Sequence, residues 1–138
     1  MNEARVVLDT SIFFGLLVRR ENALRRRFLA DAFHTFHCPR FSLVELFKHK
    51  ELIARASKLS EDDLLECLYE LLARLHFTEE GGIPIGTWME AHRLCGDVGP
   101  KDTAFVALTL YLDGRLWTDD DELKAGLSAK GFDRFFEP

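Results

Sequence analysis

Short runs of consecutive apolar residues alternate along the chain with longer segments in which apolar residues recur every three or four positions. The first short run is Val6-Val7-Leu8, which ends at the polar residues Asp9, Thr10 and Ser11. A run of this kind is typical of a fully buried strand. Strands are predicted at residues 4–8, 35–38, 115–118 and 132–136, and the connection at 77–85, which contains Gly and Pro, has room for another.

Helical spacing of apolar residues fills the segments between these strands. Ile12, Phe13, Leu16 and Leu17 repeat in this way, and Thr10 or Ser11 could cap that first helix. Residues 42–75 are expected to form a long helical hairpin whose second half opens at Ser60 in capping-box style. Further helices are predicted at residues 21–31, 87–95, 101–112 and 119–127. This alternation predicts a three-layer α/β/α fold with a central parallel sheet of about four to five short strands.

Composition narrows the class of protein. With 138 residues and 47% hydrophobic content, the chain is expected to form one domain with its own core. No apolar run approaches the roughly 18 residues of a membrane span, and the early residues do not resemble a secretory leader, so a cytoplasmic protein is expected. The three cysteines are odd in number and far apart, which favours neither a disulfide framework nor a zinc site.

Acidic residues stand at the places where an open parallel sheet forms its binding site, the carboxyl ends of the strands. Asp9 follows the first strand, residues 119–121 follow the strand at 115–118, Asp102 begins a helix after a Gly-Pro break, and Glu45 lies in the first turns of the helix after the second strand. Each acid alone could be a helix cap. Together they would repel one another unless a cation neutralised them.

Carboxylates without clustered His or Cys favour hard cations such as Mg²⁺ or Mn²⁺. Such ions lower the pKa of a bound water and stabilise the oxygens of an in-line displacement. The residues therefore point to phosphodiester hydrolysis as the reaction class.

Four segments, in order along the chain, resemble those of PIN-domain ribonucleases of the prokaryotic branch that includes the toxins of toxin-antitoxin pairs. They read VVLDTS at 6–11, SLVELFKHK at 42–50, KDTAFVAL at 101–108 and LWTDDD at 116–121. The resemblance implies a ribonuclease, most simply an endonuclease, in which one or two Mg²⁺ or Mn²⁺ ions are held by Asp9, Glu45, Asp102 and Asp120. It further implies that Thr10 and Thr118 orient these ligands through hydrogen bonds. It also implies a homodimer and a small antitoxin protein as a partner.

Two departures from the family pattern affect the third and fourth acids. The branch often has an Asp three residues before the third acid, where this chain has Gly99, and the nearest upstream Asp is Asp97. Because three acids are consecutive in the last motif, Asp119 or Asp121 could take the place of Asp120.

Basic residues near these motifs are candidates for contact with RNA phosphates. Arg19 and Arg20 belong to the most basic stretch of an acidic chain, and Lys48 and Lys50 lie about a turn beyond Glu45. Solvated helix faces and subunit contacts are often basic as well, so these residues are interpreted either as RNA contacts or as one of those surfaces.

Other functions compete with the nuclease. A phosphatase using Asp9 as its nucleophile would typically show Asp-x-Asp, but residue 11 is Ser. A receiver-like module would carry paired acids after the first strand and a Lys after the last, and neither is apparent. A catalytically weak PIN-like module that binds RNA or a protein is the main alternative, although acids at all four family positions favour activity.

Overall fold

The structure, a computed structural model, describes residues 2–18 and 22–138. Four parallel strands form the central sheet of the described chain, in the order β3-β2-β1-β4. Val7 of β1 lies opposite His37 of β2 on one side and Leu116 of β4 on the other. The strands are β1 (Arg5–Leu8), β2 (Thr35–Pro39), β3 (Leu75–Thr78) and β4 (Arg115–Trp117).

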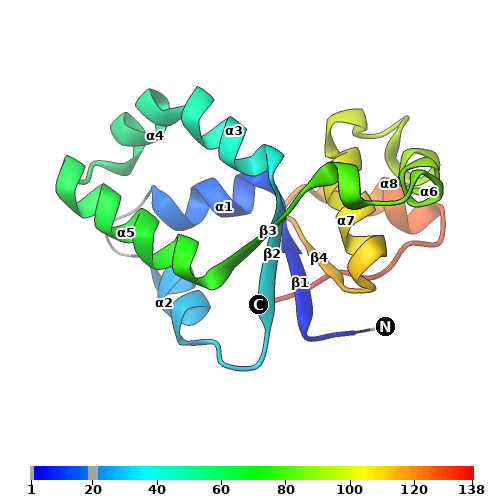
Figure 1. The fold of residues 1–138 in the computed structure, drawn as a ribbon, viewed down its shortest axis with the longest axis horizontal. Helices are drawn as coiled ribbons and strands as arrows, with labels where there is room; N and C mark the ends of the chain where they lie inside the picture. The colour runs from blue at the N-terminus through cyan, green and yellow to red at the C-terminus, as the bar shows by residue number, and fades with distance from the viewer. Residues whose placement is uncertain (1, 19–21) are drawn as a thin grey trace.

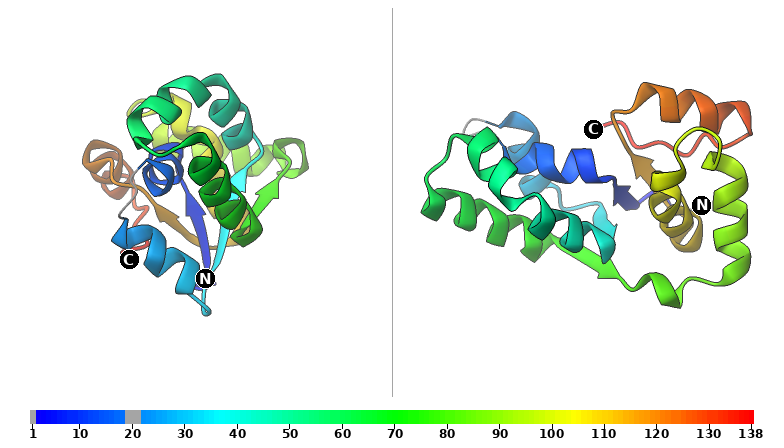
Figure 2. Two further views of the ribbon diagram at one scale, coloured as in Figure 1. Left: turned by 90° about the vertical axis from the view of Figure 1, so that its left-hand side faces the viewer. Right: turned by 90° about the horizontal axis from the view of Figure 1, so that it is seen from above.

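Helices cover both faces of this sheet (Figures 1 and 2). One layer comprises α1 (Thr10–Leu17), α2 (Ala23–Ala30), α3 (Phe41–Lys48), α4 (Lys50–Ser57) and α5 (Glu61–Arg74). The other comprises α6 (Ile85–Cys95), α7 (Thr103–Leu112) and α8 (Asp121–Ala129). The predicted three-layer α/β/α fold with a parallel sheet is thus confirmed. None of the described helices is long and apolar enough to cross a membrane.

The strand order reverses beside β1. From β1 the chain adds β2 and then β3 on one side, and it returns much later to place β4 on the other. At such a reversal, the loops that leave the two neighbouring strands diverge and open a crevice at their carboxyl ends. Here that crevice lies where Asp9 follows β1 and Thr118 follows β4.

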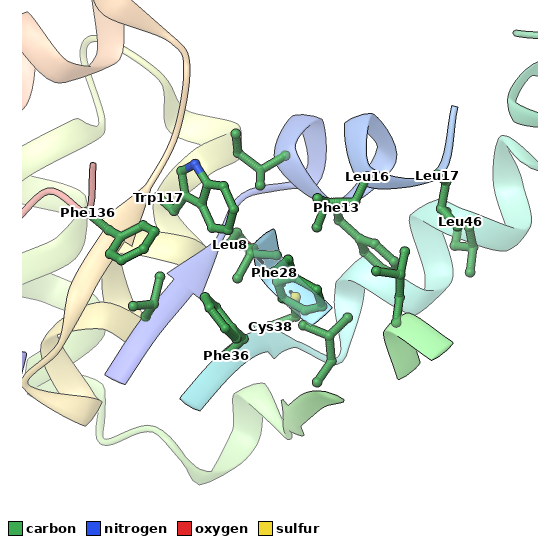
Figure 3. Packing of buried hydrophobic residues seen from close by; sticks show 14 of the residues in the cluster. Leu8, Phe13, Leu16, Leu17, Phe28, Phe36, Cys38, Leu46, Trp117 and Phe136 are labelled. Carbon is green, nitrogen blue, oxygen red and sulfur yellow. Dashed lines mark hydrogen bonds between the residues drawn. The ribbon is translucent and has the colours of Figure 1, made fainter. Parts of the chain in front are cut away.

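The alternation of side chains along β1 divides the core in two. Val6 and Leu8 point into the layer of α1 to α5, and Val7 points into the layer of α6 to α8. Figure 3 shows the first of these clusters, in which the ring centroids of Trp117 and Phe136 are 5.1 Å apart. Every residue of the buried run 6–8 therefore has a layer to contact, which is why an uninterrupted apolar run can form this strand.

Local hydrogen bonding alters two boundaries that the apolar pattern predicts. The first helix is capped by Asp9, whose Oδ1 accepts a hydrogen bond from the Ile12 N–H, rather than by Thr10 or Ser11. The first half of the predicted hairpin is divided at His49, which lies between α3 and α4. Ser60 caps α5 as predicted, since its hydroxyl accepts from the Asp63 N–H.

The strand predicted at residues 132–136 is reduced to a single bridge, in which Leu116 pairs with Phe135. The Leu116 N–H donates to the Arg134 carbonyl, and the Phe136 N–H donates to the Leu116 carbonyl. Phe132 and Phe136 are buried, so the apolar pattern at this end of the chain reflects packing rather than a ladder of strand pairs.

We expect Phe13→Ala to lower the free energy of unfolding by about 3–5 kcal/mol, because Phe13 is fully buried and its removal leaves a cavity. Phe33→Ala is the matched control: that ring is 71% exposed, and its loss should change stability by no more than about 0.5 kcal/mol. Urea unfolding followed by circular dichroism measures both. Equal effects of the two substitutions would contradict the described packing.

Candidate active site

A cavity of about 550 Å³ opens at the carboxyl ends of β1 and β4. Four carboxylates from four separate segments of the chain line it, together with one lysine, two hydroxyl side chains and three phenylalanine rings. The residues of this acid pocket are Asp9, Thr10, Ser11, Phe14, Phe41, Glu45, Lys101, Asp102, Phe105 and Asp120.

Asp9 is the most enclosed of the four acids, with 5% of its surface exposed. Its Oδ1 accepts from the Ser11 hydroxyl and from the Ile12 N–H, both at 2.9 Å. Its Oδ2 accepts from the Thr118 hydroxyl. Burial of an ionised group requires such donors, and together they fix the carboxylate at the junction of β1, α1 and β4.

Thr118 links two of the acids. It is buried, its hydroxyl donates to Asp9, and the same oxygen accepts from the Asp120 N–H at 3.1 Å. Asp120 then caps α8 by accepting from the Leu123 N–H at 3.0 Å. Among the consecutive acids 119–121, Asp120 lines the pocket, whereas Asp119 and Asp121 are not part of its described lining.

Glu45 reaches the pocket from α3, the helix that follows β2. Its Oε2 lies 3.1 Å from Nε2 of His49, one turn further along the chain. The His49 ring in turn meets the edge of Phe14, with centroids 6.2 Å apart. The His49 N–H also donates to the Glu45 carbonyl at 3.0 Å, so the backbone at the end of α3 holds the ring on the same side as Glu45.

Asp102 completes the set from the short 3₁₀ turn Pro100–Asp102 before α7. Burial raises the pKa of its carboxyl, and the negative charges of Asp9 and Asp120 raise it further, while Lys101 opposes them. Gly99 gives this carboxylate its space: a Cβ at position 99 would lie 2.7 Å from Asp102 Oδ2. A side chain at position 99 would therefore force Asp102 to move.

The donor atoms available in the pocket suit a hard divalent cation. They are carboxylate oxygens, and a bound cation would relieve the repulsion by Asp9 and Asp120 that adds to burial in raising the pKa of Asp102. Within residues 2–18 and 22–138, no three Asp, Glu, His or Cys side chains are already grouped around one point as a complete ligand set.

The sequence profile of the PIN domain matches residues 7–136. The chain belongs to the PIN-domain family. PIN domains are generally nucleases and typically use divalent metals. Among curated proteins, none matches this sequence closely enough to count as a relative.

The acids that the sequence assigns to the site, Asp9, Glu45, Asp102 and Asp120, all line the pocket of this PIN domain. Their roles as ligands stay predictions. Thr118 bonds to Asp9 as expected of an orienting residue, whereas the hydroxyl that reaches Asp9 from α1 belongs to Ser11. Thr10 lines the pocket without a described hydrogen bond to an acid.

The basic residues proposed for substrate contact are divided. Arg19 and Arg20 lie outside the described residues. Lys48 and Lys50 are exposed and line a separate pocket at the bend between α3 and α4. Arg25, from the same basic stretch as Arg19, is buried and donates to the Leu16 carbonyl at 2.7 Å.

Sequence reasoning missed the lysine and the rings of the pocket. Lys101 directly precedes Asp102, and its position beside an acid was the available signal. Phe41 lies two residues after the end of β2, and the centroid of its ring is 5.8 Å from that of the Phe105 ring. The pattern of apolar residues assigns such rings to a core, and only the fold shows that they also form a wall of the site.

Without metal, we expect Asp102→Asn to raise the melting temperature at pH 7. A raised pKa means that the ionised carboxyl destabilises the folded state. The protonated carboxyl therefore contributes its full share of stability below its ordinary pKa of 3.8, and this contribution is lost as the pH rises through the folded-state pKa. The gain should therefore vanish as pH falls below about 3.8. Thermal melts in chelator across this range measure it. Asp119→Asn is the control, and an equal gain in that variant would contradict the electrostatic cause.

Proposed function

We propose that this PIN domain is a metal-dependent ribonuclease that hydrolyses RNA phosphodiester bonds with Mg²⁺ or Mn²⁺. The observation that carries the proposal is the meeting of four carboxylates at the strand-order reversal of a nuclease-type fold. Carboxylate oxygens are the ligands that a hard cation prefers, and the pocket that these four side chains line has open space for a phosphate.

Asp9, Glu45, Asp102 and Asp120 are the residues that would hold the metal. When bound, a divalent ion supplies a lowered pKa for water and stabilises charge on the phosphate oxygens. The chain supplies the orientation. Thr118 and Ser11 fix the two oxygens of Asp9, and the Thr118 hydroxyl also holds the backbone of Asp120.

Lys101 gives the acid pocket its one cation among the described lining residues. A phosphodiester approaching four carboxylates meets repulsion, and an ammonium group beside Asp102 reduces it. The rings of Phe14, Phe41 and Phe105 supply apolar walls that limit the access of water. In this proposal, the acids bind the metal and Lys101 contacts the substrate phosphate.

The biological setting rests on the family resemblance. A toxin of a toxin-antitoxin pair, acting as a homodimer and inhibited by a small antitoxin protein, is the setting that we propose. The alternative of a catalytically weak module that binds RNA or a protein is separated from it by the cleavage assay that follows.

We expect Asp9→Asn to reduce RNA cleavage by about a hundredfold or more while leaving the fold intact. Asn caps a helix as well as Asp does, so α1 should keep its N-terminal hydrogen bond while the charge is lost. The measurement is cleavage of end-labelled single-stranded RNA with Mn²⁺, Mg²⁺ or chelator. Asp119→Asn removes an exposed neighbouring charge and should retain activity. Full activity of Asp9→Asn would contradict the role of Asp9 in the metal site. If the unmodified protein cleaves no RNA with any metal, the result would favour the catalytically weak binding module.

We also expect Mn²⁺ to raise the melting temperature, because it would bind the native site and relieve repulsion among the acids. At a concentration 100 times its Kd, a ligand of the native state stabilises it by about 2.7 kcal/mol. Scanning fluorimetry with Mn²⁺ or chelator measures the shift, which Asp9→Asn should reduce. An unchanged melting temperature at millimolar Mn²⁺ would count against a metal site.

A further inference from the structure

A second pocket, of about 290 Å³, lies at the bend between α3 and α4. We call it the basic pocket. Its lining residues are Phe47, Lys48, His49, Lys50, Glu51, Leu52 and Arg55.

Cations dominate this pocket although the chain as a whole carries a net charge of -5. Lys48, Lys50 and Arg55 form no ion pair with any described residue, even though Glu51 lies among them. Several cations elsewhere on the described surface are paired, namely Arg93 with Glu90, Lys124 with Glu137, Lys130 with Asp97 and Arg134 with Asp113, whereas isolated ones such as Lys58 and Lys101 are not. The basic pocket is thus a local surplus of positive charge, which favours an anionic ligand.

An aromatic ring stands beside these cations. Phe47 is 67% exposed, and Leu52 next to it in the pocket is 57% exposed. Exposed rings beside Lys and Arg are the combination that binds single-stranded nucleic acid, since bases stack on the ring while phosphates contact the cations. A free phosphate or an acidic peptide would not need the ring.

His49 joins the basic pocket to the acid pocket. It lines the first, and it contacts both Glu45 and Phe14 of the second. A strand that placed one phosphate among the acids could therefore continue past His49 into the basic pocket. The volume of about 290 Å³ is at the lower end of small-ligand sites, enough for about one nucleotide.

We propose that the basic pocket binds a nucleotide that flanks the cleaved bond of single-stranded RNA. Lys48, Lys50 and Arg55 contact its phosphate, and its base stacks on Phe47. The part of this inference that concerns cleavage rests on the proposed function, whereas RNA binding by the pocket can be tested without catalysis.

The test is fluorescence anisotropy of a labelled single-stranded RNA of about twelve nucleotides, in chelator and at low salt, so that no metal-dependent cleavage intervenes. We expect Lys48→Gln with Lys50→Gln to raise the Kd about tenfold and to reduce the salt dependence of binding. Phe47→Leu, which keeps an apolar side chain but removes the ring, should also raise the Kd about tenfold.

The matched control is Arg93→Gln with Arg134→Gln, which removes the same charge from residues outside both pockets and should leave the Kd nearly unchanged. Lys48→Arg with Lys50→Arg should restore most of the affinity. Loss of RNA binding in the control equal to that in the lysine variant would overturn the proposal, as would unmeasurable binding by the unmodified protein. A polyglutamate probe that binds as well as RNA, with no effect of Phe47→Leu, would instead assign the pocket to an acidic protein segment.

Hydrolysis of bis(4-nitrophenyl) phosphate with Mn²⁺ separates this inference from the proposed function. That small diester reports on the acid pocket alone. If the unmodified protein does not hydrolyse it, the result counts against the nuclease. The anisotropy measurement then still decides whether the basic pocket binds RNA. When both assays are positive, the lysine and Phe47 variants should lose more activity on RNA than on the small diester.

Discussion

The carboxylate of Asp9 is the group on which the arrangement of the site depends. Asp9 directly follows the strand β1. Its carboxylate caps α1 by accepting a hydrogen bond from the Ile12 N–H, and it also accepts one from the Thr118 hydroxyl after β4. The adjacent segments β1 and α1 and the distant end of β4 thus meet at one buried carboxylate. Its donors offset the loss of hydration that burial imposes, and they hold the two diverging loops of the strand-order reversal in register.

The remaining acids surround this fixed point less tightly. Asp120 is exposed, Glu45 is partly buried and lies against His49, and the pKa of Asp102 is raised by burial and then by the charges of Asp9 and Asp120. Ionised Asp102 is therefore repelled by Asp9 and Asp120, an effect that an uncharged side chain would not experience. Because the pKa of Asp102 is raised, its ionised form lowers the stability of the fold at neutral pH, and a bound cation would offset that loss. Gly99 contributes to the same arrangement, because only the absence of a Cβ leaves Asp102 its present position.

Much of the fold and of the candidate site follows from local sequence. The buried run Val6-Val7-Leu8 and the polar residues after it specify a central strand and place Asp9 at its carboxyl end. The same logic places Thr118 and Asp120 after β4. Features that depend on contacts between distant segments are not encoded in this way. The break at His49 accompanies a contact with Phe14 of α1, and the ring contact between Phe41 and Phe105 joins residues of α3 and α7, which belong to different layers.

The C-terminal segment has a further consequence for the sheet. Leu116 uses both its N–H and its carbonyl on Arg134 and Phe136, on the side of β4 that faces away from β1. The groups that an open edge would offer to the backbone of another chain are thus already engaged at this point, and β4 itself is only 3 residues long. A short and partly covered edge is a poor template for added strands, so the side of the sheet that carries Thr118 and Asp120 is protected from edge-to-edge aggregation.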